Sequence, residues 1–476
     1  MFTLQASIGK LPFCFRVRSG IFIALFVKAD SMDKRAFLKT STAMIVGTLF
    51  SPLLSSQEKK PLTNWAGNLI YGTTNVFAPN SVEHVQEFVK QHNKLRALGS
   101  RHSFNTIADS NKNLVSTSAL NKIVTLDKGA NTVTVEAGIK YGELCQYLHQ
   151  NGYALHNLAS LPHISIAGAC ATATHGSGVA NGNLATQVSA IEFVKADGDL
   201  VTLSRKNGEL FNGAVVGLGA LGIVTKITLD LLPTFNMQQV VYRNLPMKAL
   251  ENNFEAIMSS GYSVSLFTDW KNKNINEVWI KSRVEGNTLN SFAPDFYGAK
   301  LATKNMHPIE DQPAENCTEQ MGVSEVWYER LPHFKMGFTP SAGKELQAEY
   351  FVPFEKGYEA LMAVEKLHEK ITPHIFISEI RAVAADNLWM SPCYKRRCVA
   401  IHTTWKQEDV VMSLLPLVEE QLAPFNPIPH WAKLFTLAPS SLQSKFEKLG
   451  DFKQLMHQHD PKGKFRNEFL DKNLFS

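Results

Sequence analysis

Two stretches of small residues decide the fold of this chain: ALGSRHSFN, Ala97 to Asn105, and SLPHISIAGACATATHGSG, Ser160 to Gly178. In the first, a Gly-Ser turn follows a short strand-like run and exposes successive backbone N–H groups, which can bind a pyrophosphate without a helix. In the second, closely spaced glycines and alanines let the backbone approach a large planar ligand. A tight surface loop would explain either stretch alone. Together they indicate a cofactor site.

A third glycine-rich run, Gly217 to Gly222, matches the GxGxxG pattern of dinucleotide-binding folds in its letters only. That motif requires a helix after its last glycine, so that a pyrophosphate lies at the helix N-terminus. Here the following residues, Ile223 to Leu229, are largely β-branched and predict a strand. The acidic residue that the motif places about 20 positions further on is also missing. We therefore reject a nicotinamide Rossmann site.

Around these stretches, helices and strands alternate without a repeating βαβ rhythm, which predicts an α+β fold. Two strands, Ile123–Asp127 and Thr132–Gly138, are joined by a turn, and a helix from Tyr141 to Asn151 follows them and stops before Gly152. Ser81 is placed to cap an earlier helix, whose apolar stripe is Val82, Val85, Phe88 and Val89.

The length predicts more than one domain, because single cores stop growing at about 250–300 residues and this chain has 476. Beyond about Pro233 the strands carry aromatic residues, as in Tyr262–Trp270 and Val278–Lys281, and a helix is expected over Tyr358–Lys370. We place a leader at 1–60, a first domain at 61–233, a second domain at 234–428, and a return to the first domain at 429–476.

The net charge of +5 is concentrated in the leader, whose nine Lys and Arg and three acids leave the remaining chain at −1. A nearly neutral body lacks the clustered Lys and Arg that phosphate backbones attract, so nucleic acid is excluded as a partner. No apolar run reaches the ~20 residues of a membrane-spanning helix, so no stable membrane insertion of the mature chain is expected. Six cysteines show neither a disulfide framework nor zinc-ligand spacing, and no metal is implied.

The leader has the order of an export signal from Met32 onward: a Lys34-Arg35 pair, Phe37-Leu38-Lys39, then an apolar run from Ala43 to Phe50. It resembles a twin-arginine signal with Lys in the first basic position, which predicts a periplasmic protein that folds before export. Met32 is then the true start. The alternative is a cytoplasmic protein with an N-terminus that carries no signal.

The chain from about Asn64 to Leu470 resembles the alditol oxidases, within the vanillyl-alcohol-oxidase-type FAD-linked oxidoreductases. The resemblance rests on matching stretches along the whole of this span: NWAGN, GSRHSFN, ASLPHISIAGA with THGSG, YSVSLFTDW, NCTEQ, ERLPHF, ELQAEY, EIRAVAAD, HWAKLF and DPKGKF.

This resemblance implies an FAD-binding domain of two α+β subdomains over residues 61–233 and a substrate-binding α+β cap over 234–428. It further implies that His102 is joined covalently to the flavin 8α-methyl carbon, although Arg101 stands where relatives often carry a small residue. The cofactor-binding residues expected by the resemblance are Ala97, Leu98, Gly99, Ser100, Arg101, His102, Ser103, Ser160, Ser165, Gly168, Thr172, Ala173, Thr174, His175, Ile223 and His430.

Three clusters in the second half are candidates for contact with a substrate. Glu379 and Arg381 are two apart in the strand-like ISEIRAV, so both leave the same face, and His402 and Thr404 in IHTTW repeat this geometry. Lys433 follows His430 and Trp431 in HWAKLF. A solvated strand face, a core histidine and a surface lysine would also explain these residues.

The resemblance gives these residues roles. It assigns Arg381 and Lys433 to polarising the reacting hydroxyl, and Glu379, Thr404 and Ser160 to holding the neighbouring hydroxyls. His402 is a lesser catalytic candidate.

The implied reaction is oxidation of a linear polyol such as xylitol or sorbitol at its terminal carbon to the aldose, with dioxygen reduced to hydrogen peroxide. A monomer is expected. Three alternatives stay open at this stage: an aldonolactone oxidoreductase of the gulonolactone-oxidase type, a polyol dehydrogenase with another electron acceptor, and a sugar-binding protein without chemistry. Ala159, beside the expected flavin face, is where a methyl group could obstruct oxygen.

Overall fold

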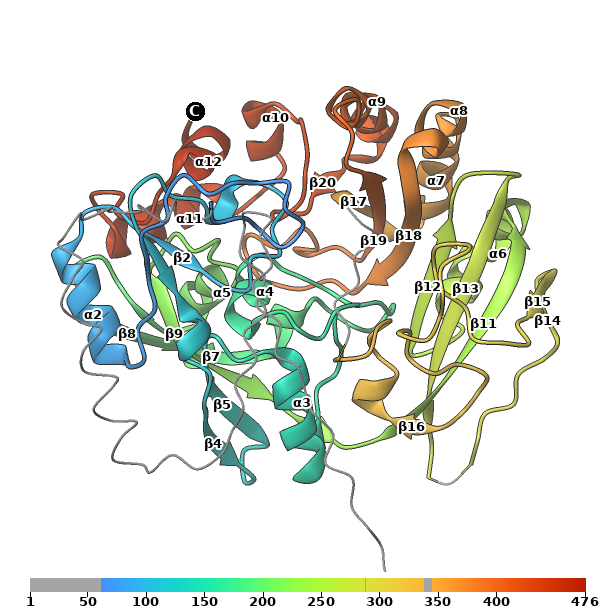
Figure 1. Ribbon diagram of the computed structural model, residues 1–476, viewed down its shortest axis with the longest axis horizontal. Helices are drawn as coiled ribbons and strands as arrows, with labels where there is room; N and C mark the ends of the chain where they lie inside the picture. The colour runs from blue at the N-terminus through green and yellow to red at the C-terminus, as the bar shows by residue number, and fades with distance from the viewer. Residues whose placement is uncertain (1–60, 287, 338–344) are drawn as a thin grey trace, which may run out of the picture. The chain divides into compact units, whose positions relative to one another are not determined.

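Helices and strands are interspersed in the computed structural model, which describes residues 61–286, 288–337 and 345–476 (Figure 1). This agrees with the predicted α+β class. The predicted leader, residues 1–60, lies outside the described residues. So do residues 287 and 338–344.

The first glycine-containing stretch, Ala97 to Asn105, begins in the last residues of a strand of a small parallel sheet. In this three-stranded sheet, strand β3 lies between β1 and β2, and the Gly99–Ser100 turn follows β2 directly. Helix α2 begins as predicted, because the Ser81 side chain accepts a hydrogen bond from the His84 N–H at 3.3 Å. The bounds of these elements are β1 Val76–Phe77, α2 Val82–Gln91, β2 Arg96–Leu98 and β3 Leu114–Ser116.

A five-stranded antiparallel sheet forms the second half of the first domain, in the order β4-β5-β9-β7-β8. The strand predicted after the GxGxxG letters is confirmed as β9. The bounds here are β4 Ile123–Asp127, β5 Thr132–Glu136, α3 Tyr141–Gln150, β6 Tyr153–Ala154, α4 Ile166–Ala171, β7 Val188–Val194, β8 Leu200–Ser204, α5 Glu209–Val215, β9 Ile223–Asp230 and β10 Leu232–Pro233.

All strands of the second predicted domain that the structure describes join one ten-stranded antiparallel sheet (Figure 1). Its order is β14-β15-β11-β13-β12-β18-β19-β17-β20, with β16 paired to β11. The bounds are β11 Asn236–Pro246, α6 Met247–Met258, β12 Ser263–Thr268, β13 Asn274–Val284, β14 Asp295–Phe296, β15 Ala299–Leu301, β16 Glu325–Val326, β17 Glu345–Pro353, α7 Gly357–Glu365, α8 His368–Ile371, β18 Ile375–Val383, β19 Cys398–Lys406, α9 Val411–Leu422 and β20 Ile428–Pro429.

The two faces of this large sheet have different chemistry. Alternate residues of β17, β18 and β19, such as Tyr350, Ile380 and Ile401, pack with α6, α7 and α9 into one apolar core. The residues between them, such as Glu349 and Glu379, leave the opposite face. Because side chains alternate along a strand, the helices cover one face and leave a polar face for a site.

The C-terminal segment packs back onto the first domain. Trp431, Leu442, Phe452 and Met456 belong to the same apolar core as α3, α4 and β9. The buried Arg96 guanidinium donates to the Gly219 and Phe465 carbonyls at 2.8 Å each, which joins β2 to the chain end. The helices of this segment are α10 Pro439–Gln443, α11 Leu449–His459 and α12 Glu468–Leu470.

Two predicted elements differ clearly in extent from the structure, and one strand of the site was not predicted. The helix expected over Tyr358–Lys370 is two helices, α7 and α8, because the Leu367 N–H bonds to the Val364 carbonyl at 2.9 Å in a tight turn. The strand expected over Val278–Lys281 extends over the whole of β13. Strand β17 was not predicted, although it supplies two of the residues described below.

Candidate active site

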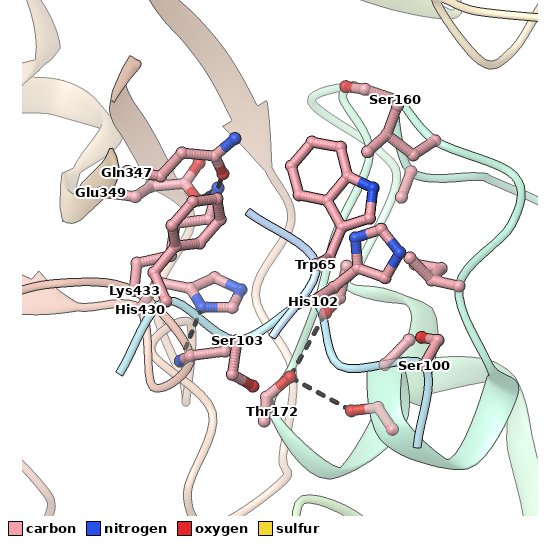
Figure 2. A pocket seen from close by; sticks show the side chains of 18 of the residues that line it. Trp65, Ser100, His102, Ser103, Ser160, Thr172, Gln347, Glu349, His430 and Lys433 are labelled. Carbon is pink, nitrogen blue, oxygen red and sulfur yellow. Dashed lines mark hydrogen bonds and ion pairs between the residues drawn. The ribbon is translucent and has the colours of Figure 1, made fainter. Parts of the chain in front are cut away.

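One cavity of about 360 Å³ lies between the two glycine-rich stretches and the polar face of the ten-stranded sheet. Figure 2 shows Trp65, His102 and Ser100 on one side of it and Gln347, Glu349, Lys433 and His430 together on the other. The sequence-predicted residues that line it are Ala97, Gly99, Ser100, Arg101, His102, Ser103, Ser160, Gly168, Thr172, Thr174, His175, Glu379, Arg381, His402, Thr404, His430 and Lys433.

Four predicted cofactor residues do not line this cavity: Leu98, Ser165, Ala173 and Ile223. The side chains of Leu98 and Ile223 belong to apolar clusters instead. Gly222 and Val224, on either side of Ile223, do line the cavity, because successive side chains of β9 point to opposite faces. Ala173 is buried with a positive φ of 54°. Ser165 lies directly beneath the Gly99–Ser100 turn.

The Gly99–Ser100 turn packs closely against the N-terminus of α4. The Ser165 N–H donates to Ser100 Oγ at 3.1 Å, and a Cβ on Gly99 or Gly168 would lie 2.7 or 2.8 Å from Ser165 Oγ. Ser165 Oγ itself is buried without a hydrogen-bond partner. Backbone packed this closely around an unsatisfied hydroxyl fits a bound, extended cofactor with hydrogen-bonding groups.

His102 is held beside the cavity by aromatic neighbours. Its ring stacks on Trp65, with centroids 5.0 Å apart, and lies 4.9 Å from the His163 ring. Burial, with His163 and Lys140 nearby, lowers the pKa of His102 to about 3, so the imidazole is neutral at pH 7. Arg101, the residue that departs from the usual pattern, has φ of 64° and donates to the Thr63 carbonyl at 3.0 Å, away from His102.

Strand register assembles the polar side chains of the opposite wall. Glu379 on β18 is paired with His402 on β19, and His402 is paired with Glu349 on β17, so the three form one row across the sheet. Thr404 and Gln347 are paired in the next row. The two pairs expected to share a strand face, Glu379 with Arg381 and His402 with Thr404, therefore lie on one wall of the cavity.

Glu349 lies at the centre of this wall and is only 1 % exposed. Its carboxylate contacts Arg381 Nη2 at 2.7 Å, His175 Nε2 at 3.1 Å, Lys433 Nζ at 3.4 Å and His402 Nδ1 at 3.7 Å. Burial alone would raise the pKa of Glu349, but Lys433, Arg381 and His175 lower it well below its ordinary value. Glu349 is therefore ionised and neutralises cations that reach the site from both domains.

Arg381 joins two carboxylates to the first domain. Its Nε lies 3.6 Å from Glu379 Oε1, and its Nη1 donates to Ser160 Oγ at 3.5 Å. Burial by itself would raise the pKa of the Glu379 carboxyl, but Arg381 and His333 lower this pKa below its ordinary value. The wall thus presents an ionised carboxylate beside a guanidinium, which suits a substrate with several hydroxyl groups.

Lys433 reaches the cavity because its segment is fixed on both sides. Asn105 donates to the Lys433 carbonyl at 2.7 Å, and the His430 N–H donates to the Glu349 carbonyl at 2.9 Å. Lys433 Nζ donates to Gln347 Oε1 at 2.7 Å and lies 2.9 Å from His402 Nδ1. Burial lowers the pKa of Lys433, and burial and Lys433 lower the pKa of His402 to about 4.

Sequence reasoning missed Gln347, Glu349 and His333 as site residues. A signal was present for the first two, because Glu345, Gln347 and Glu349 alternate with apolar residues in ELQAEY, the same pattern that identified Glu379 and Arg381. His333 lies in irregular chain, where no periodicity applies. Among the described residues, no group of His, Cys, Asp and Glu is arranged to hold a metal ion.

Two family models match the chain. A model described as an FAD binding domain matches residues 73–204, which contain both glycine-rich stretches. A model described as D-arabinono-1,4-lactone oxidase matches residues 328–473, which contain Glu349, Glu379, Arg381, His402 and Lys433.

Whole-chain relatives and solved structures agree with these matches. The alditol oxidase of a Streptomyces species is 44% identical over 413 residues, which cover 86% of this chain and 98% of that protein. The L-gulonolactone oxidase of Mus musculus is 26% identical, covering 87% and 98%. The crystal structure of cholesterol oxidase from B. sterolicum superimposes with a TM-score of 0.71 at 15% identity, covering 90% and 100%, which shows a shared fold.

Proposed function

Since the chain belongs to the alditol oxidases, a family of FAD-linked oxidoreductases of the vanillyl-alcohol-oxidase type, we propose that it oxidises the terminal hydroxyl of a linear polyol to the aldose. The observation that carries this proposal is the wall of Glu379, Arg381, Thr404 and Lys433 facing the FAD-binding stretches across one cavity. Such a wall offers donors and acceptors to several hydroxyls at once. A substrate that lacks one hydroxyl would leave a buried partner unpaired.

The residues around the Gly99–Ser100 turn fit FAD, because Gly99 and Gly168 pack where a Cβ would clash and Ser165 Oγ lacks a partner. FAD held by the residues around this turn would supply the oxidising chemistry for the carbinol carbon, with dioxygen as the final electron acceptor and hydrogen peroxide as its product. The protein's share is to orient that carbon and to stabilise negative charge on its oxygen.

Arg381 and Lys433 are the groups that polarise the reacting hydroxyl. Both side chains line the cavity, and Glu349 compensates their charge, so these cations are held in place before substrate arrives. Ser160, Glu379 and Thr404 hold the neighbouring hydroxyls. His402 is neutral at pH 7 and orients Lys433 through Nδ1, while its Nε2 lies 3.1 Å from Thr404 Oγ1.

Covalent attachment of FAD through His102 is part of the same proposal. The neutral imidazole has a free lone pair for bond formation, and Trp65 holds the ring at the edge of the cavity. His102→Ala is expected to give protein that still binds FAD but releases it on denaturation in acid, whereas the parent protein keeps yellow colour in the denatured chain. Flavin retained by denatured His102→Ala would place the link elsewhere.

One anaerobic experiment tests the reaction. Xylitol added to purified protein without oxygen should bleach the flavin band at roughly 450 nm, and air should restore it with formation of peroxide. Bleaching without recovery would favour a dehydrogenase with another acceptor. If gulonolactone bleaches the flavin and xylitol does not, the result would favour an aldonolactone oxidoreductase, the activity named for the gulonolactone oxidase relatives.

Export and a monomeric state remain part of the proposal. The order of Lys34-Arg35 and a short apolar run supports twin-arginine export, with Met32 as the start. Cell fractionation of the full chain and of Lys34→Gln/Arg35→Gln tests this, since the double variant should stay in the cytoplasm. Light scattering of the purified protein gives the oligomeric state.

A further inference from the structure

The segment Leu331–Phe334 makes contacts that the proposed reaction does not yet use. It lies against β13 on one side and the cavity on the other, and its histidine, His333, is 5 % exposed. His333 Nε2 lies 2.8 Å from Glu379 Oε1, a shorter separation than that between Glu379 and Arg381. Among the described side chains, His333 therefore contacts this carboxylate, which we expect to hold substrate hydroxyls, more closely than Arg381 does.

Glu379 and Lys281 together determine which nitrogen of His333 carries the proton, because the ionised Glu379 carboxylate facing Nε2 can only accept a hydrogen bond. Lys281 is fully buried, and its Nζ contacts three groups: the Leu331 carbonyl at 2.6 Å, the Pro332 carbonyl at 3.0 Å and His333 Nδ1 at 3.2 Å. Burial lowers the pKa of Lys281 to about 7, and in its ammonium form the three N–H donors match these three partners when Nδ1 is an acceptor. The His333 proton then lies on Nε2, where it is donated to Glu379.

The ring of His333 is also fixed by aromatic packing. Phe267 and Trp279 meet it edge to face, with centroids 5.4 and 5.1 Å away and interplanar angles of 70° and 79°. The ring therefore keeps its Nε2–H directed at Glu379. A side chain held in this way orients its partner at little entropic cost.

The backbone of the same segment supports Ser160. The N–H groups of His333 and Phe334 donate to the Ser160 carbonyl at 3.2 and 3.4 Å, and the Thr318 N–H donates to the His333 carbonyl at 2.9 Å. Ser160 belongs to the cofactor domain and Glu379 to the cap sheet. His333 thus connects two substrate-facing groups that come from different parts of the chain.

We propose that His333, oriented by Lys281, is a positioning residue that fixes Glu379 relative to Ser160 and thereby determines the affinity and selectivity for substrate hydroxyls beside the reacting one. This inference rests on the proposed function and deepens it. The charged and titratable groups around Glu379 are Arg381 on its own strand, His402 on β19, His333 in the 331–334 segment, Lys281 on β13 and Lys433. Of these, His333 makes the shortest contact with the carboxylate, at 2.8 Å against 3.6 Å for Arg381, and its backbone N–H donates to the Ser160 carbonyl.

The test compares His333→Leu with His333→Gln, because Gln has an amide N–H that can replace Nε2–H while Leu has none. For His333→Leu we expect the KM for xylitol to rise about 10- to 100-fold, the effect of losing a hydrogen bond to a charged group, with a smaller change in kcat. The acid limb of kcat/KM should move to higher pH, because the donor that favours ionised Glu379 is gone. His333→Gln should restore most of the KM.

Lys281→Met is the second variant, since it keeps the His333 ring but removes the donor that faces Nδ1. We expect the KM to rise in the same direction. Lys335→Met, at an exposed residue two positions from His333, is the matched control and should keep parent kinetics. Flavin content and the thermal midpoint are measured for every variant, so that misfolded protein is recognised and the Lys281→Met result stands if His333→Leu does not fold.

The outcomes separate this inference from the proposed function. If the parent protein does not reduce its flavin with xylitol, the proposed function fails. If it does reduce its flavin but His333→Leu keeps the parent KM and acid limb, the inference is overturned. Where His333→Leu does not fold, the same result for Lys281→Met overturns it. It is also overturned if His333→Gln is as impaired as His333→Leu, because the ring shape rather than the hydrogen bond would then be responsible.

Discussion

Glu349→Gln is the substitution that most directly tests how the site is held together. The carboxylate is buried among Arg381, Lys433, His175 and His402, and among the described residues it is the one carboxylate within 4 Å of Lys433 Nζ. Gln has nearly the same shape and keeps an acceptor oxygen, but it removes the negative charge. The change therefore isolates charge compensation from packing.

The structure gives the expected size of the effect. Removing one partner of a buried ion pair costs about 3–5 kcal/mol, because the remaining charge stays buried without compensation. Arg381 still has the Glu379 carboxylate 3.6 Å away, so Lys433 is the cation left without a nearby negative charge. The loss in the free energy of unfolding should therefore lie at the lower end of this range. The charge of Glu349 also raises the pKa of Lys433, so its removal should lower that pKa further.

Two measurements check this prediction. Urea unfolding at pH 7.5, with equal flavin content and an unchanged slope, should show a loss of about 3 kcal/mol in the free energy of unfolding. The alkaline limb of kcat/KM should move to lower pH, because Lys433 loses its proton earlier. Glu359→Gln is the matched control: its exposed contact with Lys356 at 3.4 Å should contribute about 0–1 kcal/mol. A loss below about 1 kcal/mol in Glu349→Gln with an unmoved alkaline limb would refute the reasoning.

The remaining predictions concern Lys433 and acid stability. Lys433→Ala should keep the flavin and lower kcat by about 100- to 1000-fold, as when one donor to a developing oxyanion is removed; stopped-flow reduction by xylitol measures this, and unchanged kinetics would exclude Lys433 from the mechanism. Burial lowers the pKa of His333 and His402 from 6.5 to about 4, so between these pH values the unfolded chain takes up protons that the folded chain does not. The free energy of unfolding should therefore fall as pH falls through this window, by about 1.4 kcal/mol per pH unit for each histidine, and a His402→Gln variant should show a shallower slope of thermal midpoint against pH.

Local rules determined much of this protein from the sequence by itself. Ser81 was identified as a helix cap and Ile223–Leu229 as strand because capping and β-branching act within a few residues. Alternation along single strands grouped Glu379 with Arg381 and His402 with Thr404, since side chains two apart leave the same face. The same rule would have identified Gln347 and Glu349 had β17 been predicted.

Only the tertiary structure decided which of these groups meet. The order β12-β18-β19-β17 does not follow the chain, and the register that sets Glu349, His402 and Glu379 in one row depends on pairing between strands far apart in sequence. A shift of one residue would have turned these side chains to the apolar face. Lys281 and His333 are brought to Glu379 by burial between separate elements, and no local pattern encodes that contact because it depends on how the whole sheet packs.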